Sequence, residues 1–276
     1  MRFLSFFSSS GMDDQPVQYL FTPIHLIYFL ICIVIFIVLM KIFLHKKPAT
    51  QKIFINICLV LMIVMKYAGE AIFVSEWYLF GAVSTYSHPF WDWRTFFSFQ
   101  MCGVNNILLP LVIWFKIKPL KDYIFLSSIL GGIAVMIYPL GVLSGDPFVI
   151  TLPMLRSMIV HLLLVFVPCF LIATGDTKIE RKNWKRTAIG VLGMAAWAMY
   201  GNLFVDMNAN NMYLMTNPFF GGPIPIINII PAGYHVLVLA VFFSIGLIIT
   251  YYFLDIFAAI SRRMTDKNHI PKAPLS

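Results

Sequence analysis

Seven long runs of apolar residues divide this sequence, and they restrict the chain to folds that a lipid bilayer can hold. The runs cover roughly residues 22–44, 53–75, 97–115, 123–145, 153–173, 187–206 and 231–258. As α-helices, runs of about 18 to 24 residues are long enough to cross a hydrocarbon layer of ~30 Å. Hydrophobic residues make up 60% of the chain, more than a soluble core of this size could bury. The sequence therefore predicts an all-α polytopic membrane protein with seven transmembrane helices.

The basic residues give the orientation of these helices. All but four of the 20 lysines and arginines lie in or beside the first, third and fifth connections or in the C-terminal tail. Short basic loops favour the cytoplasmic side of a membrane, so we expect the N-terminus outside and the C-terminus in the cytoplasm. In this arrangement residues 1–20 form an extracytoplasmic segment, 21–258 the membrane domain and 259–276 a cytoplasmic tail. The expected location is the cell membrane.

The net charge of +8 has a simple interpretation in this topology. The cations are spread over short loops without a sustained basic run or a nucleic-acid motif, so we expect no nucleic-acid partner. Anionic inner-leaflet phospholipids are the expected contact. The four cysteines all lie inside the predicted helices, and they imply no disulfide framework.

Polar side chains inside the predicted helices gather in the half that faces outward. The set comprises His25, Lys66, Glu70, Gln100, Cys102, Asn105, Asn106, Arg156, His161, Asn202, Asp206 and His235. An ionisable group in hydrocarbon costs about 2.5–3.5 kcal/mol on insertion scales, so such groups normally face one another or a wet cavity. The inner halves are almost purely apolar. We therefore predict a polar pocket that opens toward the outer leaflet.

Two pairs in this set share a helix face because they are spaced i and i+4. Lys66 and Glu70 form one pair, which either braces helix packing as an ion pair or lines the pocket. Asn202 and Asp206 form the other, which is either a polar helix end or support for a site.

Cys102 and His161 are the candidates for chemistry. A thiol is a weak nucleophile until a neighbouring imidazole removes its proton, and the thiolate then attacks an ester carbonyl to form a thioester. Amides of Gln100, Asn105 or Asn106 could donate to the developing oxyanion, with Arg156 as a further polar group of the pocket. This chemistry needs no soluble cofactor and no metal. The sequence thus predicts a lipid acyl transferase or an acyl-ester hydrolase.

Two alternatives remain open at this point. In the first, His25, His161 and His235, with Asp206 or Glu70, bind zinc in a histidine-metal lipid hydrolase, although no HExxH or CxxC pattern supports it. In the second, the protein is a non-enzymatic transporter or receptor with an extracytoplasmic vestibule. A transport path should continue to the cytoplasm, and the nearly apolar inner halves argue against that for ions or sugars.

Four short motifs also occur in order along the chain. They are FTPIHL at 21–26, FQMCG at 99–103, VHLLLVFVPCFL at 160–171 and NNMYLM at 210–215. With this set the sequence resembles the YwaF-like bacterial membrane proteins, a group that is similar to the eukaryotic transmembrane protein 164 family. The likeness covers about residues 20–255.

This resemblance implies a seven-helix acyltransferase that moves a fatty acyl chain between phospholipids through a cysteine, aided by a histidine. By motif, Cys102 corresponds to the nucleophile and His161 to the histidine of the fifth helix. His25 matches the Ser-x-x-His-like start of the first helix loosely. Many YwaF-like proteins carry a histidine shortly before the cysteine, in a pattern like LPLHLC, and Gln100 stands near that place here.

Overall fold

The fold was analysed in a computed structural model of the 276-residue chain. The structure describes residue 6 and residues 19–80, 97–139, 142–143, 148–222, 224–225 and 227–266. Side chains are described up to residue 68 in the range 19–80 and up to residue 261 in the range 227–266. Most of the expected N-terminal segment and of the tail lies outside the described residues.

Within the described ranges the protein contains seven α-helices and no strand. The helices are α2 (Pro23–Phe43), α3 (Pro48–Phe80), α5 (Met101–Trp114), α6 (Lys118–Ile137), α7 (Leu152–Ala173), α8 (Trp184–Tyr200) and α9 (Tyr234–Asp266). Short turns of other helix types flank or join them: η1 (Arg181–Asn183), η2 (Gly201–Val205), η3 (Asn211–Tyr213) and η4 (Ile227–Ile229). The all-α class predicted from sequence is confirmed for this part of the chain.

Six of the helical segments are long and apolar enough to cross a bilayer, namely Pro23–Phe43, Pro48–Ala68, Lys118–Ile137, Leu152–Ala173, Arg181–Val205 and Tyr234–Ser261. The chain is therefore built as a multi-pass membrane protein. The third predicted span differs from the others, because α5 has only 14 residues. At 1.5 Å per residue it rises about 21 Å, short of the ~30 Å of a hydrocarbon layer.

The fourth predicted span is displaced toward the N-terminus. We expected it over 123–145, but α6 begins at Lys118 and ends at Ile137. Pro139 follows two residues later, and Tyr138 before it is non-helical (φ −128°, ψ 84°), as the residue preceding a proline tends to be. The shift moves Asp122, which the sequence places in a loop, into the helix.

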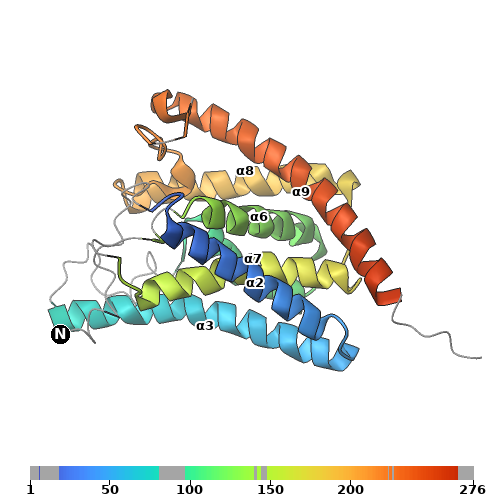
Figure 1. Cartoon of the computed structure of the whole chain (residues 1–276). Coiled ribbons are helices and arrows are strands. Elements are labelled where there is room, and N and C mark those ends of the chain that lie inside the picture. Colours follow the sequence, from blue (N-terminus) through green and yellow to red (C-terminus); the bar gives the residue numbers. More distant parts are fainter. Residues whose placement is uncertain are drawn as a thin grey trace, which may run out of the picture.

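The three basic connections lie at one end of the bundle, which we call the basic end (Figure 1, right). α2 and α3 form an antiparallel pair that turns there. At the same end, the Nζ of Lys121 donates to the Lys178 carbonyl at 2.6 Å, and Arg181 pairs with Asp255 of α9. This clustering agrees with the distribution of charge among the loops of the sequence.

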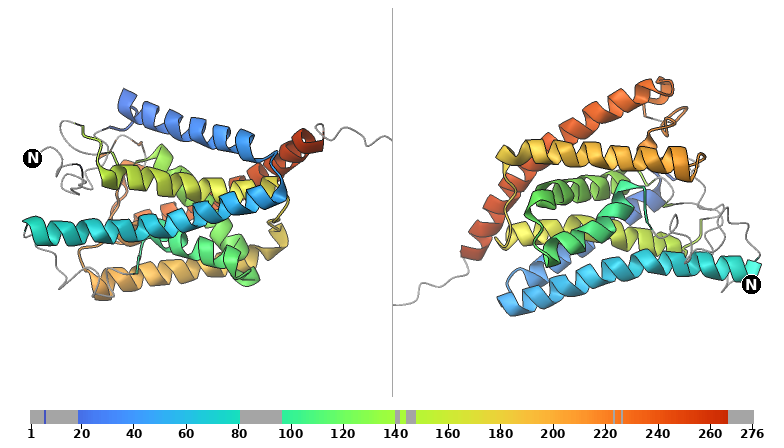
Figure 2. Two further views of the ribbon diagram at one scale, coloured as in Figure 1. Left: turned by 90° about the horizontal axis from the view of Figure 1, so that it is seen from below. Right: turned by 180° about the vertical axis from the view of Figure 1, so that it is seen from behind.

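Helix α6 is the centre of the arrangement. It contacts α2, α5, α7, α8 and α9, while α9 crosses α8 obliquely and lies on α6 and α7 (Figures 1 and 2). Glycines permit the closest of these approaches. An added Cβ would lie 2.3 Å from the Tyr123 ring at Gly190 of α8, and 2.9 Å from Leu130 at Gly246 of α9. Small residues at such contacts are typical of membrane helices, where association depends on close packing.

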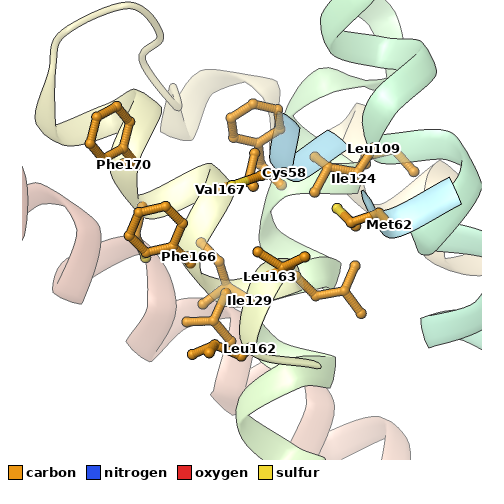
Figure 3. Close-up of a cluster of buried hydrophobic side chains, with 14 of the residues drawn as sticks. Cys58, Met62, Leu109, Ile124, Ile129, Leu162, Leu163, Phe166, Val167 and Phe170 are labelled. Atoms are coloured by element: carbon orange, nitrogen blue, oxygen red, sulfur yellow. The ribbon is translucent and has the colours of Figure 1, made fainter. Parts of the chain in front are cut away.

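The interior of the bundle is filled by apolar side chains from α3, α5, α6 and α7 (Figure 3). Phe166 and Phe170 of α7 are fully buried there, and both stack edge-on against Phe54 of α3. The outward faces of α2, α3, α8 and α9 carry exposed leucines, isoleucines and phenylalanines. A bundle with a packed centre and an apolar exterior fits a lipid environment.

Candidate functional site

Cys102 lies in the first turn of α5, at the end of the bundle opposite the basic end. The helix begins after Gln100, whose extended backbone (φ −79°, ψ 138°) ends the preceding segment. The Cys102 side chain is half-buried and packs against the core, whereas Cys32, Cys58 and Cys169 are buried within it. Cys102 is thus the most exposed of the four cysteine residues.

His161 lies on α7 with a defined hydrogen-bonding pattern. Its Nδ1 is 2.7 Å from the Ser157 carbonyl and 3.2 Å from the Ser157 hydroxyl. A carbonyl only accepts, so Nδ1 carries the proton and Nε2 keeps its lone pair. Among the described groups, none donates to that Nε2. This is the tautomer that a general base needs.

Two consecutive glycines of α6 lie beside the Cys102 side chain and the His161 backbone, respectively. A Cβ added at Gly131 would lie 3.2 Å from the Cys102 Sγ, and one added at Gly132 would lie 2.8 Å from the His161 carbonyl oxygen. α5 also contacts α7 directly. Helices three and five of the prediction therefore meet, with the Cys102 thiol beside Gly131 and the His161 backbone beside Gly132.

Cys102 and His161 are not hydrogen-bonded to each other within the described structure. Catalytic hydrogen bonds often tighten only when substrate binds, so the separation leaves the pairing open.

The two asparagines after Cys102 face neighbouring helices. Asn105 donates to the Ser127 hydroxyl of α6 at 2.9 Å, and Asn106 donates to the Met62 carbonyl of α3 at 2.9 Å. Both are fully buried, and the side-chain oxygen of each lacks a hydrogen-bond partner. Each amide therefore ties α5 to a neighbour and retains one N–H for another acceptor.

The other two membrane histidines are held differently from His161. His25 accepts at Nδ1 from the Phe21 N–H at 3.1 Å, and its Nε2 lies 3.0 Å from the Met136 carbonyl. His235 accepts at Nδ1 from the Gly233 N–H at 3.0 Å, and its Nε2 lies 2.8 Å from the Tyr213 carbonyl. Both nitrogens of each ring are engaged by backbone groups, so both imidazoles fasten chain segments together.

Three predicted site residues converge on the turn η3. The Gln100 Oε1 accepts from the Met212 N–H at 2.7 Å. Asn202 exchanges hydrogen bonds with Asn211, including Asn211 N–H to its Oδ1 at 2.8 Å, while His235 binds the Tyr213 carbonyl. Met212 and Tyr213 both have positive φ (54° and 56°), which is uncommon for residues other than glycine. The NNMYLM motif is thus a strained turn tied to the start of α5.

The remaining predicted residues are separate from this turn or outside the described side chains. Arg156 is half-buried one residue before Ser157 on α7. Asp206 ends η2 and accepts from the Asn208 N–H at 3.0 Å, which makes it part of a local turn. Lys66 of α3 has its Nζ 5.8 Å from the centre of the Tyr67 ring. Glu70 lies on α3, but its side chain is outside the described ones.

The described residues contain no group of three histidines, cysteines or acids that could hold a metal ion. The geometry of His25 and His235 explains this, since their lone pairs and N–H groups already have backbone partners. The zinc alternative drawn from the sequence gains no support here.

Two polar residues were missed by the sequence reasoning. Ser157 positions His161, and its signal was available as the i, i+4 spacing on one helix face. Asp122 is a buried carboxylate near the basic end of α6 that accepts from Asn183 at 2.6 Å. It was overlooked because the predicted span began one residue after it.

A comparison with family models decides which proteins this chain is related to. The model of the TMEM164 family matches residues 20–251, nearly the whole described bundle. The chain belongs to the TMEM164 family. This confirms the resemblance to the transmembrane protein 164 family, whereas the likeness to YwaF-like bacterial proteins stays a prediction. No curated protein and no solved structure matches the chain.

Proposed function

We propose that this TMEM164-family protein is a lipid acyl transferase, or an acyl-ester hydrolase, in which Cys102 is the nucleophile and His161 the general base. The observation that carries the proposal is the hydrogen bond from His161 Nδ1 to the Ser157 carbonyl, which leaves Nε2 able to accept a proton on a helix that contacts α5. The proposed location is the cell membrane, with phospholipids as the partners and no soluble cofactor.

The proton transfers follow from the His161 tautomer. Its Nε2 takes the proton of the Cys102 thiol, and the thiolate forms a C–S bond to the ester carbonyl carbon. As the tetrahedral intermediate collapses, the C–O bond to the lysolipid breaks and the imidazolium returns its proton to the leaving oxygen. The products of this half-reaction are an acyl thioester and a free hydroxyl.

The second half-reaction reverses these roles. A lysolipid hydroxyl gives its proton to Nε2 and attacks the thioester, which regenerates the thiol. Water in the same position would give a fatty acid instead. Amide N–H groups of Asn105, Asn106 or Gln100 are proposed donors to the oxyanion of each intermediate, and Arg156 is proposed to face the lipid headgroup.

Substrate would approach from the end of the bundle opposite the basic end. Cys102, Ser157 and His161 are half-buried there, while α7 is buried from Leu162 to Phe170. The turn η3, fastened to Gln100, lies over the start of α5. This combination supports a site near one membrane surface, in accord with the sequence prediction of an outer-leaflet pocket.

The proposal is tested with purified protein in nanodiscs that contain a phospholipid labelled on its acyl chain. We expect label to become covalently bound, to be released by hydroxylamine as a thioester is, and to disappear in Cys102→Ala. Cys58→Ala and Cys169→Ala are matched controls, because they remove buried thiols and should retain label. Retention of label by Cys102→Ala would show that the nucleophile is wrong.

The base is tested separately from the nucleophile. His161→Gln should slow thioester formation by about 10²–10⁴-fold, the usual contribution of general base catalysis. His25→Gln is the control, since both ring nitrogens of His25 are engaged by backbone groups. Equal rates in the two variants would remove His161 from the mechanism.

A further inference from the structure

Buried polar side chains of α5 and α6 lie between Cys102 and the basic end, where Ser127 faces Asn105 of α5, Tyr123 packs on Gly190 of α8 and Asp122 binds Asn183. We call the set Asn105, Ser127, Ser128, Tyr123 and Asp122 the polar seam. All five are at most 5% exposed. The apolar pattern of the sequence predicts an almost purely apolar half here, so the seam is a feature that the proposed Cys–His chemistry does not explain.

The seam contains an unusual concentration of polar atoms without hydrogen-bond partners. The set comprises the Oδ1 of Asn105, the Oγ of Ser128, the hydroxyl of Tyr123 and the Oδ1 of Asp122. Of these, the Asp122 oxygen has only the Nζ of Lys121 at 3.5 Å, too far for a strong hydrogen bond. Leaving a buried polar group unsatisfied costs about 1–3 kcal/mol, so four together would oppose folding unless something binds them.

The unpaired atoms are distributed along α6 between Cys102 and the basic end. Ser127 lies one turn from Gly131, whose Cβ position is 3.2 Å from the Cys102 Sγ, and Asn105 donates to the Ser127 hydroxyl. Tyr123 lies a further turn toward the basic end, beside Asp122. Nine residues separate Asp122 from Gly131, which is about 14 Å of helix rise.

The lower end of the seam reaches groups that face solution. Asp122 accepts from Asn183, which lies in η1 at the basic end. Lys121 beside it is 30% exposed. On the adjoining helices, the Thr187 hydroxyl of α8 lies 3.2 Å from the Tyr251 hydroxyl of α9. Polar groups therefore continue from the seam to the surface.

We propose that the polar seam binds a file of water molecules that connects Cys102 with the solution at the basic end. Water molecules satisfy buried polar groups that lack a protein partner, whereas apolar cavities stay dry. Intramembrane polar residues characteristically line such wet paths. At a spacing of about 2.8 Å per hydrogen bond, roughly four or five molecules span the 14 Å. The inference concerns hydration and does not rest on acyl transfer.

Radiolytic footprinting tests the inference on the unmodified protein. Brief X-ray irradiation in nanodiscs forms hydroxyl radicals from water in place, and these oxidise the side chains beside it. We expect oxidation of the Tyr123 ring at least tenfold above that of Phe125, Phe166 and Phe170. These three are matched controls, because they are aromatic, at most 2% exposed and part of the apolar core. If Tyr123 is oxidised no faster than these three phenylalanines, the inference is overturned.

Two variants distinguish water in the seam from water that reaches Tyr123 by another route or through the acyl-transfer site. Ser127→Ala removes the hydroxyl at the middle of the seam and should lower the Tyr123 oxidation severalfold, while its small size preserves the packing. Cys102→Ala ends the proposed acyl transfer but should leave Tyr123 oxidation unchanged. The two proposals can therefore fail independently. Unchanged Tyr123 oxidation in Ser127→Ala would count against the seam as the route of the water.

Discussion

Gly132→Ala should destabilise the bundle at the centre of the candidate site. The new methyl carbon would lie 2.6 Å from the Val165 Cγ2 and 2.8 Å from the His161 carbonyl oxygen. Both distances are well inside ordinary van der Waals contact, and the second atom is backbone, so it moves only if α6 and α7 separate. Overpacking of this kind costs about 1–3 kcal/mol.

The control for this variant is Gly193→Ala on α8, where an added Cβ meets nothing within 4 Å. Alanine favours a helix over glycine by about 0.8–1 kcal/mol, so this variant should be neutral or stabilised. The readout is the denaturation midpoint of each protein in mixed micelles titrated with SDS. The difference between the denaturation midpoints of the two variants measures the strain caused by the methyl group at position 132. Equal midpoints would refute the close packing of α6 on α7.

A second substitution refines the same test. Val165→Ala removes the Cγ2 atom but leaves the His161 carbonyl, so it should recover only part of the loss caused by Gly132→Ala. Residues in contact usually show interaction energies of about 0.5–3 kcal/mol in a double-mutant cycle. Strictly additive effects of the two changes would mean that these side chains do not touch.

Three further outcomes follow from the site. His235→Ala removes the hydrogen bond to the Tyr213 carbonyl and should release the strained turn, at a cost of about 1–3 kcal/mol in stability. The release should be seen as faster proteolysis within 207–230, and unchanged cleavage would contradict this fastening role. Ser157→Ala keeps the backbone carbonyl that binds His161 Nδ1, so the rate of thioester formation should fall less than tenfold and its pH profile should stay the same. A shifted pH profile would show that the Ser157 hydroxyl sets the tautomer. Dialysis against a chelator should leave thioester formation intact, and a loss that zinc reverses would instead favour the histidine-metal alternative.

The helical class was predictable because it depends on the length and apolar character of the segments alone. Burial of backbone in lipid permits only helices or closed barrels, so runs of about 20 apolar residues predict transmembrane helices. Helix ends were less predictable. The sequence places Asp122 outside its span because apolarity begins at Tyr123, whereas the helix starts at Lys118 with Pro119 in its first turn.

The roles of the histidines could not be separated by sequence. His25, His161 and His235 share a residue type and a depth, and all three fit a base or a metal ligand. What distinguishes them is which backbone group each Nδ1 meets: an N–H for His25 and His235, and a carbonyl for His161. That difference arises from local chain geometry, since His161 lies within a helix and bonds to the i−4 carbonyl, while the other two begin their helices. Position relative to a helix start is a signal that sequence reasoning could use.

The placement of two glycines next to each other on α6 links the candidate site to the packing of the whole bundle. Consecutive residues of a helix point about 100° apart, so Gly131 and Gly132 open two different faces, one toward Cys102 on α5 and the other toward His161 on α7. With only one glycine, one of the two neighbouring helices could approach α6 closely, and a side chain at the other position would keep the second helix at a distance. The same pair therefore brings α5 and α7 close to α6, with the Cys102 Sγ and the His161 carbonyl oxygen on adjoining faces of that helix. Since α6 also carries Ser127, Tyr123 and Asp122, the helix on which the two candidate residues pack is the one that lines the proposed route for water.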